Sequence, residues 1–143
     1  MPTARRTRVL AAGPDAVWRV AGDPNHQPRW WPKVQRVEAV ERDAFTRVYG
    51  TAKGRPVRAD FLVAERGERR VVWRQRIEDT PFERILQASD TVVAVEPASE
   101  GGTRVTLEVR QRLRGLSKLG GFLVKRATRK QLDEALDALE GVV

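Results

Sequence analysis

The stretch TRVTLEVRQR, residues 103–112, carries the clearest periodic signal in the chain. Its apolar residues Val105, Leu107 and Val109 alternate with polar ones, so the two sets point to opposite faces of an extended strand. One apolar and one polar face is the pattern of a strand in an antiparallel sheet that is covered on one side only. The stretch therefore predicts such a sheet, and another part of the chain must cover its apolar face.

Six further segments have strand character. Residues 69–78 alternate as clearly, with Val71, Trp73, Gln75 and Ile77 on one face and mainly arginine on the other. Valine and isoleucine together outnumber leucine, which favours strands because branched side chains pack well on a pleated surface. The remaining strand candidates are residues 7–11, 34–42, 44–51, 57–65 and 82–95.

Two short helices and one long helix complete the pattern. Residues 15–21 show helical spacing of apolar side chains with Pro14 in the first turn, and residues 25–32 allow at most one distorted turn. Residues 118–143 contain no proline and are rich in good helix formers, so they would form a helix about 39 Å long. Only this helix can cover seven strands. We therefore predict a single α+β domain over residues 1–143.

Composition excludes several classes of protein. The chain has no cysteine, which rules out disulfides and a thiol nucleophile and suits a reducing compartment. The arginines near the N-terminus precede no apolar segment typical of a signal peptide, and no apolar stretch is long enough to span a membrane. We therefore expect a cytoplasmic protein.

The net charge of +8 arises from basic residues spread along the whole chain. Such a charge can attract nucleic acid, an anionic membrane or an acidic ligand, or can reflect only the arginine preference of a GC-rich genome. The tryptophans do not alternate with the basic residues as a base-stacking surface requires, so no nucleic-acid partner is expected.

Residues for catalysis or metal binding are scarce. His26 is the only histidine, which excludes a multi-histidine metal site, and its loop setting favours a solvated side chain. Gly101 and Gly102 are better explained by a turn with positive φ than by phosphate binding. We assign no catalytic residue, metal or cofactor.

Four motifs occur in order along the chain: PDAVW at 14–18 followed by Asp23-Pro24, RWWPKV at 29–34, VVWR at 71–74 and GGTRVTL at 101–107. They resemble motifs of the START/Bet v 1-like (SRPBCC) superfamily, in its polyketide cyclase/dehydrase and lipid transport group, over essentially the whole chain. This resemblance implies the helix-grip fold: a curved seven-stranded antiparallel sheet wrapped around the long C-terminal helix, with two short helices after the first strand. It also implies a deep cavity between sheet and helix that holds an apolar or aromatic molecule.

The expected ligand-binding residues combine large inward side chains with a few polar ones. Aromatic residues on inward faces can be plain core or cavity wall. Gln75 could anchor a polar group of the ligand or bond to a neighbouring side chain. The full set is Trp31, Tyr49, Phe61, Trp73, Gln75, Leu107, Phe122, Leu123 and Arg126.

The long helix has an unusual charge order. Its first half carries Lys and Arg and its second half Asp and Glu, which opposes the helix dipole. At 100° per residue, Phe122, Leu123, Arg126 and Lys130 share a face, whereas the apolar residues after residue 131 point nearly the opposite way. We therefore expect the helix to change its buried face, or to bend, at residues 128–131. Arg126 and Lys130 could then meet an anionic head group at the cavity mouth, or could simply extend into water.

Three functions fit these observations. The first is binding of a small hydrophobic, lipid-like or polyketide-like ligand, which could be anionic, by a monomer or homodimer. The second is a polyketide aromatase/cyclase or dehydrase-type enzyme, with Tyr49, Gln75 and Arg126 as its hydrogen-bonding candidates. The third is an interaction protein that uses its basic surface.

Overall fold

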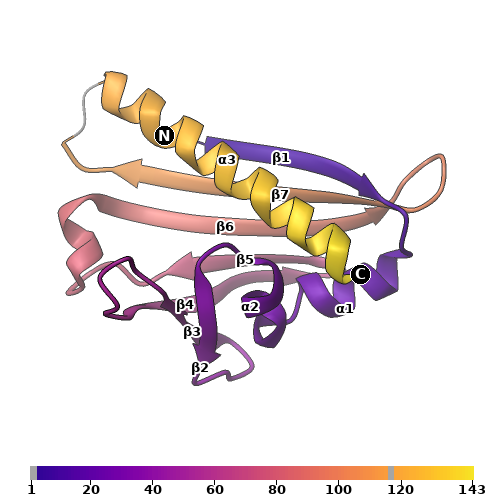
Figure 1. Cartoon of the computed structure of the whole chain (residues 1–143), viewed down its shortest axis with the longest axis horizontal. Coiled ribbons are helices and arrows are strands. Elements are labelled where there is room, and N and C mark those ends of the chain that lie inside the picture. Colours follow the sequence, from indigo (N-terminus) through magenta and orange to yellow (C-terminus); the bar gives the residue numbers. More distant parts are fainter. Residues whose placement is uncertain (1–2, 116–117) are drawn as a thin grey trace.

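The computed structural model describes residues 3–115 and 118–143, and its centre is one antiparallel sheet. The strand order is β1-β7-β6-β5-β4-β3-β2 (Figure 1). This confirms the predicted α+β class and seven-stranded antiparallel sheet. The strands are β1 (Thr3–Leu10), β2 (Val34–Glu38), β3 (Ala44–Tyr49), β4 (Val57–Gly67), β5 (Arg70–Gln75), β6 (Leu86–Pro97) and β7 (Thr103–Leu113).

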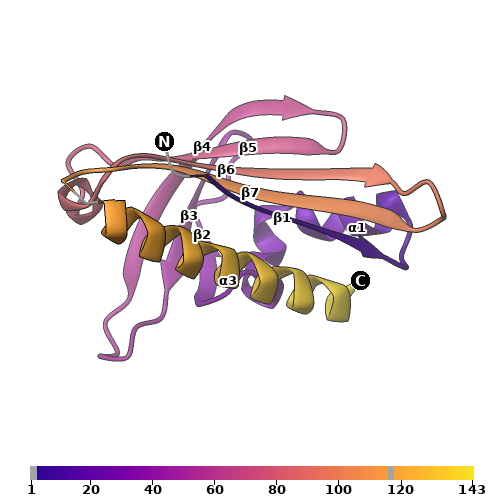
Figure 2. The same cartoon turned by 90° about the horizontal axis from the view of Figure 1, so that it is seen from above.

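Short helices lie at both ends of the sheet, and one long helix lies across one face (Figure 1). Pro14 starts the first helix, where its missing N–H costs nothing and its fixed φ suits the helix. The long helix α3 runs across the sheet (Figures 1 and 2). None of the described helices has the length and apolar character needed to span a membrane. The helices are α1 (Pro14–Ala21), η1 (Pro24–His26), α2 (Gln27–Trp30), η2 (Pro81–Arg84) and α3 (Lys118–Val142).

Some expected strand limits are wrong. The strand predicted at 82–95 begins only at Leu86, because Pro81–Arg84 form a 3-10 turn after Thr80, whose hydroxyl donates to the carbonyl of Ile77 (2.6 Å). The strand predicted at 34–42 ends at Glu38, where Ala39 adopts a positive φ of 50°. The strand predicted at 69–78 ends at Gln75, before a turn in which Asp79 has a φ of 62°.

The hydrophobic core lies between the inner face of the sheet and the second half of α3. Val105 and Leu107 of β7 are fully buried, as the alternation in residues 103–112 predicts. The side chains of α3 that share this core are Leu132, Ala135, Leu136 and Leu139.

The first half of α3 behaves differently from the expectation. Phe122 and Leu123 are 57% and 53% exposed, whereas Val124 and Thr128 are half-buried on the side of the helix that later carries Leu132. The predicted change of buried face at residues 128–131 is therefore wrong. The same side of the helix faces the sheet from Val124 onward, and the large apolar side chains of Phe122 and Leu123 point away from it.

Three bulges bend the sheet. The pairing register shifts between Val34 and Arg36, between Val63 and Glu65, and between Leu86 and Ala88. A bulge bends its strand and increases the local twist. In Figure 2, β2 and β3 accordingly run steeply across the direction of β6 and β7. This curvature makes the inner face concave.

The turn before β7 requires glycine at one position in particular. Gly101 and Gly102 have φ angles of +99° and +76°, which confirms the predicted positive-φ turn. A Cβ at Gly102 would lie 2.3 Å from the carbonyl oxygen of Leu10, whereas a Cβ at Gly101 would meet nothing within 4 Å.

We predict that Gly102→Ala lowers the free energy of unfolding more than Gly101→Ala does. Both changes introduce positive-φ strain, about 1–3 kcal/mol, but only the first adds a clash with backbone. Urea denaturation of the two variants measures the difference. Equal losses would show that the contact with Leu10 is relieved at no cost.

Candidate functional site

A cavity of about 500 Å³ lies between the inner face of the sheet and the first half of α3. Its volume is in the range of small-molecule sites. Ile85 lines it and is 58% exposed, so the cavity reaches the surface there, at its mouth. The lining residues are Trp31, Arg47, Tyr49, Phe61, Gln75, Phe82, Ile85, Leu86, Ser89, Thr91, Val109, Gln111, Leu113, Val124 and Gln131.

Arg47 is the only charged residue in this lining, and it is 3% exposed. It lies on β3 between Phe45 and Tyr49, and the period of two in a strand places all three on the inner face. Its Nε donates to Oε1 of Gln27 on α2 (2.5 Å), and its Nη1 donates to the hydroxyl of Tyr49 (3.1 Å). Two neutral acceptors therefore hold the guanidinium in place.

Four aromatic rings surround the guanidinium. Its Cζ lies 4.4 Å from the ring centroid of Phe61 and 4.6 Å from that of Trp31. The rings of Trp73 and Phe45 lie 5.7 Å and 6.0 Å away. A cation over aromatic faces gains on the order of 2 kcal/mol when it is shielded from water. The aromatic residues thus partly offset the cost of burying this charge.

The charge of Arg47 is not neutralised within the described residues. No carboxylate there pairs with it, and its Nη2 is buried without a hydrogen-bond partner. Buried charges are normally paired, and a buried donor without an acceptor is costly. The arrangement is that of a site for an anion or an oxygen-rich group, presented at the wall of an apolar cavity.

Other polar groups in the lining also lack a partner. Trp31 Nε1 and Gln75 Nε2 are buried without a hydrogen bond within the described residues. The Tyr49 oxygen accepts from Arg47, so its own hydrogen is free to donate. Cation, indole and phenol all offer hydrogens. The cavity therefore favours a ligand that accepts hydrogen bonds.

The residues expected at the site fall into three groups. Trp31, Tyr49, Phe61 and Gln75 line the cavity. Trp73 and Leu107 are buried core residues outside its lining, although the ring of Trp73 lies beside Arg47. The third group is exposed on the far side of α3 and does not line the cavity: Phe122, Leu123 and Arg126.

The residue that sequence analysis missed is Arg47. In the stretch FTRVY, residues 45–49, either alternate set contains apolar side chains, so the pattern does not decide which face is inward. Val48 is in fact buried on the opposite face, which hides the signal further. The pairing of Phe45 with Phe61, whose rings stack at 5.2 Å, could have indicated that Arg47 points inward.

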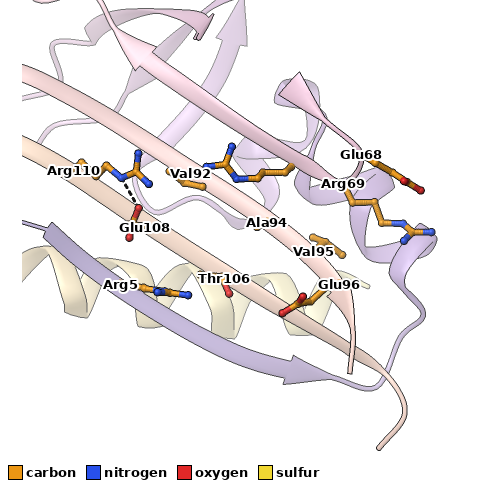
Figure 3. A pocket seen from close by; sticks show the side chains of 11 residues that line it. Arg5, Glu68, Arg69, Val92, Ala94, Val95, Glu96, Thr106, Glu108 and Arg110 are labelled. Atoms are coloured by element: carbon orange, nitrogen blue, oxygen red, sulfur yellow. Dashed lines mark hydrogen bonds and ion pairs between the residues drawn. The ribbon is translucent and has the colours of Figure 1, made fainter. Parts of the chain in front are cut away.

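A second hollow, about 410 Å³, lies on the outer face of the sheet (Figure 3). Most of its charged groups are already paired: Arg110 donates to Glu108 (2.6 Å) and Arg69 pairs with Asp15 (2.9 Å). Seven of its eleven lining residues are charged, whereas Arg47 is the one charged residue in the lining of the inner cavity. This hollow lacks the unpaired, buried polar groups that mark the inner cavity.

His26 lies outside the cavity, on η1, where its side chain is 3.7 Å from Asp23 and 3.3 Å from Arg29. Within residues 3–115 and 118–143, no group of three or more His, Cys, Asp or Glu side chains is placed to hold a metal ion.

We predict that Arg47→Met changes the free energy of unfolding by no more than about 1 kcal/mol. It leaves Gln27 without its partner, but it removes a buried charge and keeps a flexible side chain against the rings. Leu107→Ala, at a fully buried core position, provides the scale and should cost about 2–5 kcal/mol. Denaturant titration compares the two, and a loss above 3 kcal/mol for Arg47→Met would make Arg47 a structural residue.

Solved structures with this fold are numerous. A START superfamily protein from Mycobacterium smegmatis superposes with a TM-score of 0.79 at 15% identity, covering 99% of this chain and 96% of the other. A Thermus thermophilus protein gives 0.73 at 24% identity, covering 98% and 95%. The di-domain ARO/CYC BexL from the BE-7585A biosynthetic pathway gives 0.79 at 25% identity, but the 99% of this chain that aligns spans only 46% of BexL.

No curated protein matches the chain. The model of one protein family, described as polyketide cyclase / dehydrase and lipid transport, matches residues 1–143. Together with the helix-grip architecture, which it shares with the START superfamily structure, this match shows that the chain belongs to the polyketide cyclase/dehydrase and lipid transport family.

Proposed function

We propose that this protein binds one small apolar molecule with an anionic end, and that Arg47 holds the anion. The observation that carries the proposal is the buried guanidinium with an unpartnered Nη2 in the wall of the cavity. A carboxylate is the simplest group that fits, because its two oxygens match the donor geometry of a guanidinium.

The rest of the lining supports an apolar body for the ligand. Hydrocarbon surface in the same lining comes from Phe82, Leu86, Val109, Leu113 and Val124. A mostly apolar pocket with a few fixed polar groups is typical of sites that bind lipid-like molecules. We therefore propose Arg47 as the polar anchor of the ligand, in place of Arg126, which the sequence had suggested.

Dodecanoate and dodecanol test this proposal, because they share a hydrocarbon chain and differ in the anionic group. The wild type should prefer dodecanoate, and Arg47→Gln should weaken dodecanoate binding about 10–100-fold because charge-assisted hydrogen bonds are lost. Isothermal titration calorimetry measures both ligands. Arg126→Gln, which removes an exposed charge, is the matched control and should bind as the wild type does.

Gln27→Glu tests the role of charge without removing the arginine. A carboxylate placed where Oε1 of Gln27 accepts from Arg47 would neutralise the guanidinium from within. We expect this variant to lose most of its affinity for dodecanoate while its affinity for dodecanol changes little. If dodecanoate bound equally well to wild type, Arg47→Gln and Gln27→Glu, the proposed anion site would be wrong.

A second candidate is an aromatase/cyclase. The 25% identity to the ARO/CYC BexL favours it, as does a cavity whose unpaired groups are mainly donors. A folded poly-β-ketone presents carbonyl oxygens along its length. Arg47, Tyr49 and Trp31 could stabilise the negative charge that develops on such an oxygen during ring closure.

Incubation with a linear poly-β-ketone thioester separates the two candidates. A cyclase would convert the spontaneous product mixture, analysed by liquid chromatography and mass spectrometry, into one dominant cyclised product. Tyr49→Phe, which removes the hydroxyl that accepts from Arg47 and can donate to a substrate, should reduce that conversion if the tyrosine donates to the substrate. If the wild-type protein left the product mixture unchanged, the cyclase function would be wrong and ligand binding would be the remaining candidate.

A further inference from the structure

The first half of α3 presents an apolar and basic surface to solvent. We call it the outer face and define it by Phe122, Leu123, Arg126, Ala127 and Lys130, which are all exposed. Phe122, Arg126 and Lys130 are spaced four residues apart and form one ridge of the helix. Two large apolar side chains, 57% and 53% exposed, stand beside these cations. Folding of the chain alone does not account for their position, because they gain little burial.

The charged side chains that define the outer face are both positive, and its C-terminal limit adjoins Glu134, which lines a surface hollow together with Lys130. Arg129 lies beside Lys130, whereas Lys125 is half-buried seven residues before Leu132, on the side of the helix that faces the sheet; the sequence from Gly120 to Leu132 contains no aspartate or glutamate. Within the part of the chain that the structure describes, none of these four basic residues forms an ion pair. Positive charge in the first half of a helix also opposes the helix dipole. These cations are therefore available to an anionic partner.

The second half of the same helix shows that such pairing is possible here. Asp133 pairs with Arg6 (3.2 Å), and Asp137 pairs with Arg8 (2.5 Å), both on β1. Ion pairs therefore connect the acidic half of α3 to strand β1. Lys125, Arg126, Arg129 and Lys130 form no such ion pair with the described residues.

The outer face adjoins the cavity mouth. Val124, in the same helical turn as Phe122 and Leu123, lines the cavity. Ile85, a further exposed apolar residue, lines it at the mouth. In Figures 1 and 2, η2 and the N-terminal end of α3 lie at the same end of the molecule. A flat partner that covered the outer face would also lie close to the cavity entrance.

We propose that the outer face docks on an anionic phospholipid membrane. Lipid phosphates would pair with Arg126, Lys130 and the neighbouring Arg129, while Phe122 and Leu123 enter the acyl boundary, as in interfacial amphipathic helices. A second copy of the chain fits less well, because each copy would bring the same cations to the contact. An acidic protein would need an apolar pocket shaped to receive Phe122 and Leu123. A membrane needs no such shaped pocket, because it offers an anionic head-group layer for the cations and an apolar acyl layer for the two apolar side chains.

Docking goes beyond the proposed ligand binding and rests on residues that do not line the cavity. Sedimentation with vesicles of phosphatidylcholine, with or without phosphatidylglycerol, tests it directly. The wild type should bind only the anionic vesicles. Phe122→Ser/Leu123→Ser should lower the partition coefficient about tenfold or more because both side chains lose their insertion.

Charge variants separate specific docking from general attraction. Arg126→Gln/Lys130→Gln should weaken binding to anionic vesicles about tenfold or more, since each cation near such a surface contributes substantially. Arg5→Gln/Arg19→Gln removes the same net charge from exposed positions elsewhere and should weaken binding less than about threefold. Equal effects of the two pairs would overturn the proposed orientation.

A fluorescent label reports insertion at the outer face. Because the chain contains no cysteine, Leu123→Cys and Leu62→Cys can each carry one environment-sensitive dye at a position that is more than half exposed. Anionic vesicles should shift the emission of the dye at 123 to the blue and leave the dye at 62 unchanged. A dye at 123 that stays in water would overturn the proposal.

Two further outcomes would also overturn membrane docking. A dimer that dissociates in Phe122→Ser/Leu123→Ser, measured by light scattering, would assign the outer face to a second copy. Vesicle binding that depends on Arg126 and Lys130 but not on Phe122 and Leu123 would indicate a partner whose acidic surface has no apolar layer. Dodecanoate binding by the same variants should stay at the wild-type level, so a failure here is distinct from a failure of the cavity proposal.

Discussion

The structure depends on the mismatch between a broad concave sheet and the single long helix that covers it. The second half of α3 fills its share of the inner face with Leu132, Ala135, Leu136 and Leu139, which are buried. Among the described side chains of the first half, Val124, Thr128 and Gln131 lie toward the sheet, and they leave the space beside them unfilled. The cavity is the consequence. The bulges in β2, β4 and β6 add curvature to the sheet that this helix spans.

The cavity in turn explains why a charge can lie inside the fold. In a filled core, Arg47 would require a carboxylate, because an unpaired buried charge is strongly unfavourable. Here four aromatic rings, a glutamine and a tyrosine hold the guanidinium in one orientation, while Nη2 remains without a partner among the described residues. A binding group that is held rigid before the ligand arrives loses little entropy on binding. A buried polar group that lacks a partner in an otherwise regular fold is typical of a functional site.

Sequence periodicity predicted the sheet and the long helix because each depends on a local repeat. Residues 103–112 and 69–78 show alternation that one buried face imposes, and the absence of proline after residue 117 allowed a continuous helix. The site was less predictable for two physical reasons. Arg47 lies in a strand where both faces carry apolar residues, so alternation could not assign its direction. The direction of Phe122 and Leu123 depends on which side of α3 meets the sheet, and the stronger apolar set around Leu136 determines that side for the whole helix.

This last point links the two proposals. A straight helix has one orientation, so burying Leu132, Ala135, Leu136 and Leu139 necessarily turns Phe122 and Leu123 outward. If the outer face had only to be soluble, polar residues at 122 and 123 would serve better, since exposed large apolar side chains gain little from folding. The apolar residues instead occur beside the cavity entrance, among cations that have no ion-pair partner in the described structure. The helix that closes the core in its second half therefore has, in its first half, the composition of a contact surface. An apolar ligand crosses water poorly, so the most direct route to the cavity is from a surface that already dissolves it.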